Sequence, residues 1–182
     1  SRELFIEKSI IKSSTERHDI KILKNLRDIT LSGWIILTTS MKHIRELGKE
    51  CEKLWAKVLM QWISGGKSKI LSNFEKNRKN LVLIWLIDSW KDEYTLWKEN
   101  GPIIIAKLPF DPPSDPYFLS RTVGMSNNFS LYSEPIVILR INSLIWNIRE
   151  SWYIWPLYTL DSRLEDTVWG QSVMREILEE NL

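Results

Sequence analysis

The apolar stripe between Ser40 and Gly66 is the feature of this sequence that most constrains the fold. Its apolar side chains recur every three or four residues, which places them on one face of an α-helix. The stripe consists of Ile44, Leu47, Cys51, Leu54, Trp55, Val58, Leu59 and Trp62. Ser40 is a favourable N-cap residue, and Gly65-Gly66 stands where a helix C-terminus accepts glycine. The stretch therefore predicts one amphipathic helix, roughly 36 Å long at about 1.5 Å per residue.

Two other stretches of the N-terminal part favour helix. A capping box with apolar residues behind it at helical spacing predicts a helix to about Arg27, from Ser13, Glu16, Ile20, Leu23 and Leu26. The run over residues 81–87 resembles a buried strand by itself. However, apolar spacings of three or four continue beyond it to Trp97, and a helix stop follows at Asn100-Gly101-Pro102. We therefore predict one helix from about Leu81 to Glu99.

The residues after Pro102 are typical of short strands. The segment 103–108 is rich in isoleucine and runs into a proline-rich connector over residues 109–116. Strands are predicted over 117–123 and 136–141, with strand and loop over 144–160. A second capping box, from Ser162 to Glu165, predicts a closing helix to about Glu180.

Helices segregated from strands indicate an α+β fold. We expect a helical N-terminal part over about 1–100, short antiparallel strands over about 103–160, and a C-terminal helix. A length of 182 residues fits a single domain over residues 1–182, with the proline-rich connector 109–116 as a candidate subdomain boundary.

The charges are distributed unequally along the chain. Residues 1–80 carry 17 Lys and Arg and 9 Asp and Glu, a net charge of +8, whereas residues 81–182 carry 8 and 14, a net charge of −6. Such asymmetry is typical of a basic face for an anionic partner, or of head-to-tail association with a second copy of the chain. Two independently solvated surfaces are the alternative interpretation.

The sequence gives little support for a metal site or for nucleophilic catalysis. His43 and Cys51 are eight residues apart on the predicted helix, about 12 Å along its axis, too far to share one ion. No Gly-x-Ser-x-Gly elbow occurs. Asp88, Asp92 and Glu93 form a carboxylate cluster with a metal-dependent nuclease as its functional interpretation, although the solvent face of a helix explains it equally well. We expect no metal, no cofactor and, on balance, no enzyme.

The segment Gly65-Gly66-Lys67-Ser68 resembles the end of a phosphate-binding loop. The upstream glycine of that motif is missing, and the preceding element is predicted to be a helix rather than a strand. We therefore interpret the two glycines as a helix stop.

A basic segment follows these glycines and supports nucleic-acid binding. Single-strand binders combine cations that follow the backbone with aromatic platforms. RNA or single-stranded DNA binding is accordingly the alternative hypothesis, through Lys67, Lys69, Lys76, Arg78 and Lys79. Trp62 and Trp85 are nearby, but both belong to apolar periodic patterns, where packing in the core is their expected role.

The leading hypothesis is a non-enzymatic binding module that uses an exposed aromatic surface and self-associates or binds a protein partner. Ten tryptophans are difficult to bury in a domain of this size, and Trp, Tyr and Arg are enriched in interface hot spots. The expected surface comprises Arg149, Trp152, Tyr153, Trp155 and Tyr158. Scarce Ala and Gly beside abundant Lys, Ile, Asn and Ser hint at a viral accessory or structural protein.

The cellular setting follows from two further observations. Cys51 is the single cysteine, which favours a reducing intracellular compartment, cytoplasm or nucleus. The longest apolar run, Leu81 to Ile87, is far shorter than the ~20 residues that a membrane span needs. We therefore expect no membrane span.

Overall fold

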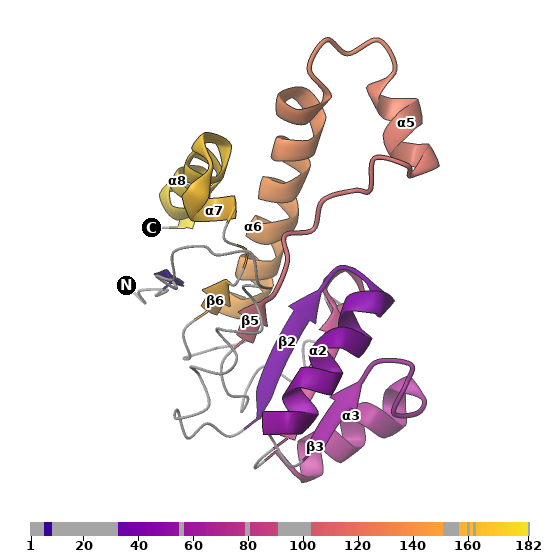
Figure 1. The fold of residues 1–182 in the computed structure, drawn as a ribbon. Helices are drawn as coiled ribbons and strands as arrows, with labels where there is room; N and C mark the ends of the chain where they lie inside the picture. Colours follow the sequence, from indigo (N-terminus) through magenta and orange to yellow (C-terminus); the bar gives the residue numbers. More distant parts are fainter. Residues whose placement is uncertain are drawn as a thin grey trace.

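The computed structural model describes residues 6–8, 33–54, 57–78, 81–90, 103–150, 157–159, 161 and 163–181. Its centre is an all-parallel sheet of six strands in the order β1-β6-β5-β2-β4-β3 (Figure 1). The strands are β1 (Ile6–Lys8), β2 (Trp34–Thr38), β3 (Lys57–Met60), β4 (Leu81–Leu86), β5 (Ile103–Ile105) and β6 (Leu157–Thr159).

Helices cover both faces of this sheet. They are α2 (Met41–Leu54), α3 (Lys67–Lys76), α4 (Ile87–Trp90), α5 (Pro116–Thr122), the π-helical turn η3 (Phe129–Ser133), α6 (Glu134–Glu150), α7 (Arg163–Asp166) and α8 (Val168–Asn181). The fold is therefore α/β with a parallel sheet. The predicted α+β arrangement with short antiparallel strands is wrong.

Alternate residues of each central strand belong to two separate cores. In β2, Ile35 and Leu37 pack in the cluster that contains residues of α3, α4, α6, α7 and α8, whereas Trp34 and Ile36 pack in the cluster beneath α2. β4 and β5 divide in the same way. Strands buried on both faces consist of continuous apolar runs, without the alternation that identifies a strand with one solvent face. This is why the run at 81–86 could be extended into a helical pattern.

The predicted helix from Ser40 to Gly66 is partly correct. Its start is confirmed, because Ser40 Oγ accepts a 3.2 Å hydrogen bond from the backbone N–H of His43. The helix ends at Leu54, however, and β3 follows. Within β3 the side chains alternate: Val58 packs on the α2 side and Leu59 on the other. Over so short a segment, the same apolar positions fit both the stripe of a helix and the two-residue alternation of a strand. The prediction therefore extended the helix through β3.

Further predictions for elements in the second half differ from the structure. The predicted helix from 81 to 99 begins as strand β4 and continues as α4 to Trp90, and residues 91–99 lie outside the described part. The strand predicted over 117–123 is α5, because Asp115 Oδ1 accepts hydrogen bonds from the N–H groups of Tyr117 (2.8 Å) and Phe118 (3.2 Å) and caps a helix.

The strand predicted over 136–141 belongs to α6, which packs on the sheet through residues at helical spacing: Val137, Ile138, Ile141, Leu144 and Ile145. Tertiary packing overrides the strand preference of isoleucine and valine. The strand predicted at the start of the segment 103–108 is confirmed as β5. The strand-and-loop prediction for 144–160 is wrong over residues 144–150, which continue α6, and is confirmed at β6. The closing helix is confirmed as α7 and α8, divided at Thr167. The helix predicted to end near Arg27 lies outside the described residues.

Within the described part of the chain, no helix combines the length and the apolar character that crossing a membrane requires.

Candidate functional site

Parallel strands bring their carboxyl ends to one edge of the sheet, where ligands of open α/β folds bind. The chain leaves β2 toward α2 on one face and leaves β5 toward α6 on the other, so the direction of the connections reverses between these neighbouring strands. Behind this edge, Thr38 Oγ1 lies 2.5 Å from Nδ1 of His43, and both side chains are buried. His43 therefore has a structural partner, which fits a positioning role for the start of α2.

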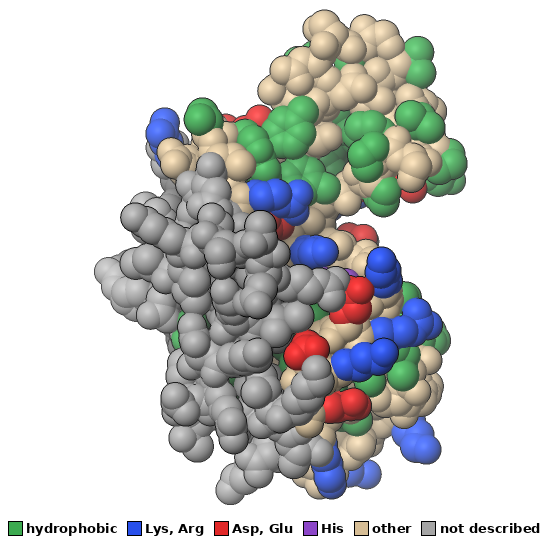
Figure 2. Space-filling model, in the orientation of Figure 1, with side chains coloured by type: hydrophobic (Ala, Val, Ile, Leu, Met, Phe, Trp, Pro, Cys, Tyr) green, Lys and Arg blue, Asp and Glu red, His purple; other side chains and the backbone are tan. Residues whose placement is uncertain are grey.

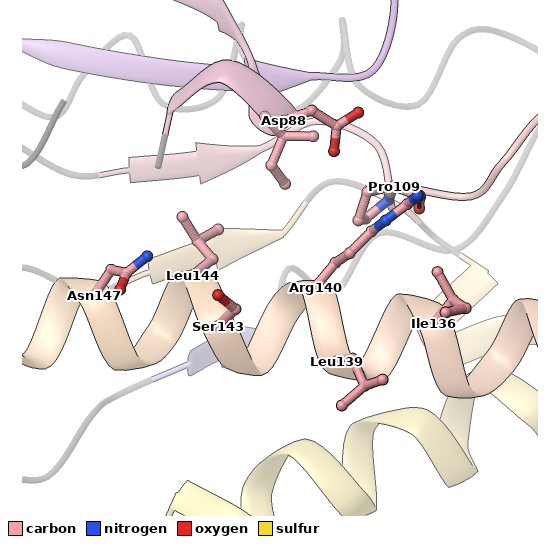
Figure 3. A pocket seen from close by; sticks show the side chains of 9 residues that line it. Asp88, Pro109, Ile136, Leu139, Arg140, Ser143, Leu144 and Asn147 are labelled. Carbon is pink, nitrogen blue, oxygen red and sulfur yellow. Dashed lines mark hydrogen bonds between the residues drawn. The ribbon is translucent and has the colours of Figure 1, made fainter. Parts of the chain in front are cut away.

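A pocket of about 440 Å³ lies between α6 and the carboxyl ends of β4 and β5. Figure 3 shows Arg140, Ser143, Leu144 and Asn147 of α6 on one side and Asp88 on the other. The remaining lining residues are Ile87, Pro109, Ile136 and Leu139. The pocket thus has apolar walls and a few polar groups, the usual composition of a recognition site.

Arg140 is held at the rim of this pocket. Its Nη2 lies 2.6 Å from Oδ1 of Asp111, and its Nη1 donates a 2.6 Å hydrogen bond to the carbonyl oxygen of Pro109. The hydroxyl of Tyr132 donates to Asp111 Oδ2 and accepts from Arg121, each at 3.2 Å. This network joins α5, η3 and α6 to the segment after β5, so the guanidinium of Arg140 is oriented within the folded chain.

An aromatic cluster fixes the two C-terminal helices against the same segment. Phe110, Phe129 and Trp169 pack with ring centroids 5.0–5.8 Å apart. The guanidinium of Arg163 lies 5.0 Å from the Phe110 centroid and forms a bidentate pair with Asp161. Its hydrogen bond to Asp161 raises the pKa of Arg163 above the ordinary arginine value. The rings pack on one another and on the guanidinium of Arg163, which is paired with Asp161. We therefore assign the cluster a structural role.

A second surface of interest begins where β3 ends. Gln61 is buried, and its side chain donates to Ser89 Oγ at 2.8 Å and accepts from the N–H of Leu86 at 2.7 Å. The next residue, Trp62, has a φ of +62° and is 63% exposed. The predicted core position of Trp62 is therefore wrong, whereas that of Trp85 is confirmed. Trp62 no longer belongs to a helix stripe, because the chain is strand and turn here.

Helix α3 follows this turn directly. Ile70 and Phe74 are buried against the sheet, and Lys69 and Lys76 are exposed. Of the other predicted nucleic-acid-binding residues, Lys67 is half-buried at the start of α3, Arg78 is half-buried two residues beyond its end, and Lys79 lies outside the described residues. The structure thus gathers the described members of the basic segment around a single helix.

The segment Gly65-Gly66-Lys67-Ser68 does follow a strand, so the predicted preceding helix is wrong. Gly65 has a φ of +134°, and Gly66 is the N-cap residue of α3 without a side-chain cap. The position of the missing upstream glycine is occupied by Gln61, whose side chain is committed to β4 and α4. The resemblance to a phosphate-binding loop remains partial.

Most residues of the predicted aromatic surface fall outside the described part of the chain. Arg149 lies in the last turn of α6, and Trp152, Tyr153 and Trp155 are among the residues not described. Tyr158 is half-buried in β6 and packs against the core beneath α2. The exposed tryptophans of the described part are Trp62 and Trp146, which sequence reasoning did not single out as exposed.

The structure describes one residue of the predicted carboxylate cluster. Asp88 is exposed at the pocket, and Asp92 and Glu93 are not described. Among the described residues, no group of three or more His, Cys, Asp or Glu side chains is arranged to hold a metal ion. Cys51 is buried in the core beneath α2, as predicted for a small apolar side chain.

No protein-family model and no curated protein matches this chain. Among solved structures, the chain is similar to that of S. tokodaii Xpd4, with a TM-score of 0.57 and 12% sequence identity. The similarity covers 81% of this chain and 30% of the Xpd4 chain, so the chain spans less than a third of that protein. At this identity the similarity shows the fold, an α/β arrangement with a parallel sheet.

Proposed function

We propose that this protein binds single-stranded nucleic acid through the Trp62–α3 surface, which comprises Trp62, Ile63, Lys67, Lys69 and Lys76. The exposure of Trp62 beside the lysines of α3 carries this proposal. An aromatic ring in water beside positive charge is the combination that single-strand binders use, with bases stacked on the ring and phosphates near the cations.

The turn that presents Trp62 is well supported. A non-glycine residue at positive φ costs on the order of 1 kcal/mol, so the surrounding contacts must offset it. Gln61 anchors the residue before Trp62, and Ser64 closes the turn by accepting from the N–H of Met60 at 2.9 Å while its own N–H donates to the Met60 carbonyl oxygen at 3.0 Å. A backbone fixed in this way limits the conformational entropy that is lost when a base stacks on the ring.

The charge around this surface favours an anionic partner. Residues 41–78 carry nine Lys and Arg and four Glu, a net charge of +5. In Figure 2, Lys and Arg side chains lie among Asp and Glu side chains over the right of the lower half of the molecule, where Figure 1 places α2 and α3. The first turn of α3 contains no acidic residue, and its N-cap Gly66 offers no side-chain acceptor. The first backbone N–H groups of α3 can therefore contribute to phosphate binding.

The predicted aromatic protein-binding surface at Arg149–Tyr158 stays a prediction beside this proposal. A non-enzymatic role fits the Trp62–α3 surface, since stacking and charge are sufficient for binding. We place this role in a reducing intracellular compartment, because the single cysteine of the chain is buried in the core.

Fluorescence anisotropy with a labelled single-stranded oligonucleotide tests the proposal. We expect binding at low salt that weakens as salt rises, and a duplex of the same sequence should bind less well. Trp62→Ala should weaken binding about tenfold or more, because base–aromatic stacking contributes roughly 1–3 kcal/mol. Tyr117→Ala, which removes an even more exposed ring on α5, should leave binding unchanged.

The lysines are tested by their salt dependence. The double substitution Lys69→Glu and Lys76→Glu should weaken binding and reduce the salt slope by about 1–2. A wild-type protein that fails to bind at low salt, or a Trp62→Ala variant with wild-type affinity, would overturn the proposal.

A further inference from the structure

The pocket beside α6 has hydrogen-bonding side chains on two sides. Arg140, Ser143 and Asn147 follow one another at spacings of three and four residues, so they lie on one face of α6. Figure 3 shows Arg140 and Asn147 extending from α6 toward the side of the pocket where Asp88 of α4 lies. The volume of about 440 Å³ falls in the range of about 300–1,000 Å³ that is usual for ligand sites. The pocket is therefore a candidate binding site in its own right.

Arg140 offers fixed hydrogen-bond donors to a ligand in this pocket. Its Nη1 donates to the carbonyl oxygen of Pro109 and its Nη2 to Oδ1 of Asp111, each at 2.6 Å. A guanidinium has more N–H groups than these two contacts use, and its planar shape gives the others a fixed direction. This side of the pocket therefore suits a ligand edge that carries two neighbouring acceptors.

Asp88 offers the opposite chemistry. Its side chain is exposed at the pocket, and among the described residues its carboxylate has no hydrogen-bond or ion-pair partner. An ionised carboxylate accepts hydrogen bonds and donates none, and its two oxygens can take two parallel N–H groups. Asp88 therefore suits a ligand edge that carries two neighbouring donors. Pro109, Leu144 and Ile136 supply apolar surface for the faces of a flat ring that carries such edges.

A guanine base matches this distribution of groups. Its O6 and N7 are neighbouring acceptors on one edge, the edge to which arginine binds in nucleic-acid recognition. Its N1–H and N2–H₂ are neighbouring donors on the adjacent edge, and an unstacked base exposes both edges. Adenine, cytosine, thymine and uracil each place an acceptor beside the donor on the Watson–Crick edge, so a carboxylate there would meet a second lone pair. We propose that the pocket beside α6 recognises an unstacked guanine of the bound single strand, with Arg140 on its O6–N7 edge and Asp88 on its N1–N2 edge.

This inference rests on the proposed function, because the guanine belongs to the strand that Trp62 binds. The turn that carries Trp62 and the pocket lie at the same edge of the sheet, beyond the carboxyl ends of β3 and β4. Gln61, directly before Trp62, donates to Oγ of Ser89, which directly follows Asp88, so one hydrogen bond joins the two sites. A base stacked on Trp62 and a neighbouring base in the pocket can therefore belong to one strand.

Single-base substitutions in the oligonucleotide test the recognition of guanine. The ligands are labelled oligodeoxythymidine strands that differ in one central base: guanine, adenine, hypoxanthine or 7-deazaguanine. By fluorescence anisotropy, the guanine strand should bind about tenfold more tightly than the adenine strand. Hypoxanthine, which lacks the N2 amine, and 7-deazaguanine, which lacks N7, should each bind at least about threefold more weakly than guanine. Equal affinities of the guanine and adenine strands would overturn the inference, even if the protein bound free guanosine monophosphate.

Substitutions in the protein test the role of the pocket. Asp88→Asn changes an exposed side chain without changing its size and should reduce the preference for guanine over adenine to about twofold or less. Glu75→Gln, which removes the same charge from the exposed surface of α3, should keep the preference. An Asp88→Asn variant with the wild-type preference would overturn the assignment of guanine to this pocket.

The variant Trp62→Ala separates this inference from the proposed function. It should weaken the binding of all strands alike and leave the ratio of their affinities unchanged. Binding that depends on Trp62 and on salt, but not on the central base, would overturn the guanine pocket alone. A protein that binds none of the strands would overturn the proposed function as well.

Discussion

The side-chain amide of Gln61, at the end of β3, donates a 2.8 Å hydrogen bond to Ser89 Oγ in α4. The same amide accepts from the N–H of Leu86, and Ser89 Oγ donates to the Leu86 carbonyl oxygen at 3.2 Å. One buried glutamine therefore joins the carboxyl ends of two neighbouring strands and sets the start of the turn that exposes Trp62. The proposed binding surface depends on this junction.

Substitution of Gln61 by alanine should lower the free energy of unfolding by about 1–2 kcal/mol, because the half-buried N–H of Leu86 loses its acceptor. Urea denaturation followed by circular dichroism measures this change. Ser126→Ala, at an exposed position, should stay within about 0.5 kcal/mol of the wild type. The same Gln61 variant should bind oligonucleotide more weakly, and an unchanged stability would show that the junction is dispensable.

Gly170→Ala should be strongly destabilising. A Cβ atom at this position would lie 1.9 Å from the carbonyl oxygen of Arg163 and 2.7 Å from Cα of Leu164, so α7 and α8 would have to separate. We expect a loss of about 3 kcal/mol or more, comparable with other severe packing errors. Gly66→Ala is the matched control, since its Cβ would meet nothing within 4 Å and its φ of −69° suits alanine. Thermal unfolding should separate the two variants clearly.

Asp161→Ala should lower the free energy of unfolding by about 2–3 kcal/mol. The carboxylate of Asp161 accepts from the N–H of Leu108 at 3.0 Å, from the N–H of Arg163 at 3.3 Å and from two nitrogens of the Arg163 guanidinium, so its removal leaves four donors without this acceptor. Glu75→Ala, an exposed acid on α3, should change stability little. Chemical denaturation of both variants tests this, and equal losses would contradict the structural role of Asp161.

Cys51 should make the protein sensitive to alkali. Burial, with a smaller effect from Glu50 and then Glu52, raises the pKa of its thiol from 9.0 to about 12. Between these values the unfolded chain releases the thiol proton and the native protein keeps it, so this contribution to stability falls as pH rises and is constant below pH 9.0. Denaturation midpoints at about pH 8 and about pH 10 should differ more for the wild type than for Cys51→Ala. Equal differences would contradict the buried thiol as the source.

Several local features could be predicted because neighbouring residues decide them. Ser40 opens α2 through a hydrogen bond to a residue three positions away. The capping box from Ser162 to Glu165 correctly predicted a helix near the C-terminus. The basic segment 67–79 lies largely on one exposed helix, as a polar pattern with two apolar anchors allows.

The candidate site was less predictable, because its parts are far apart in the sequence. Trp62 was assigned to the core from its spacing, and its exposure follows from the strand β3 and the Gln61 junction with β4. The pocket beside α6 combines Asp88 with Arg140 and Asn147, which meet only when α6 packs across the sheet edge. No spacing rule within one segment could bring these residues together.

By itself, the sequence determined where apolar residues recur, where helices begin and how charge is divided between the two halves of the chain. Only the tertiary structure decided that Leu81–Leu86 and Lys57–Met60 are strands, that the described strands pair in parallel, and that Trp62 and Trp146 remain in water. The physical reason is that a helix satisfies its hydrogen bonds within one segment, whereas a parallel strand needs partners distant in the chain. A short apolar run is compatible with either structure until those partners are in place.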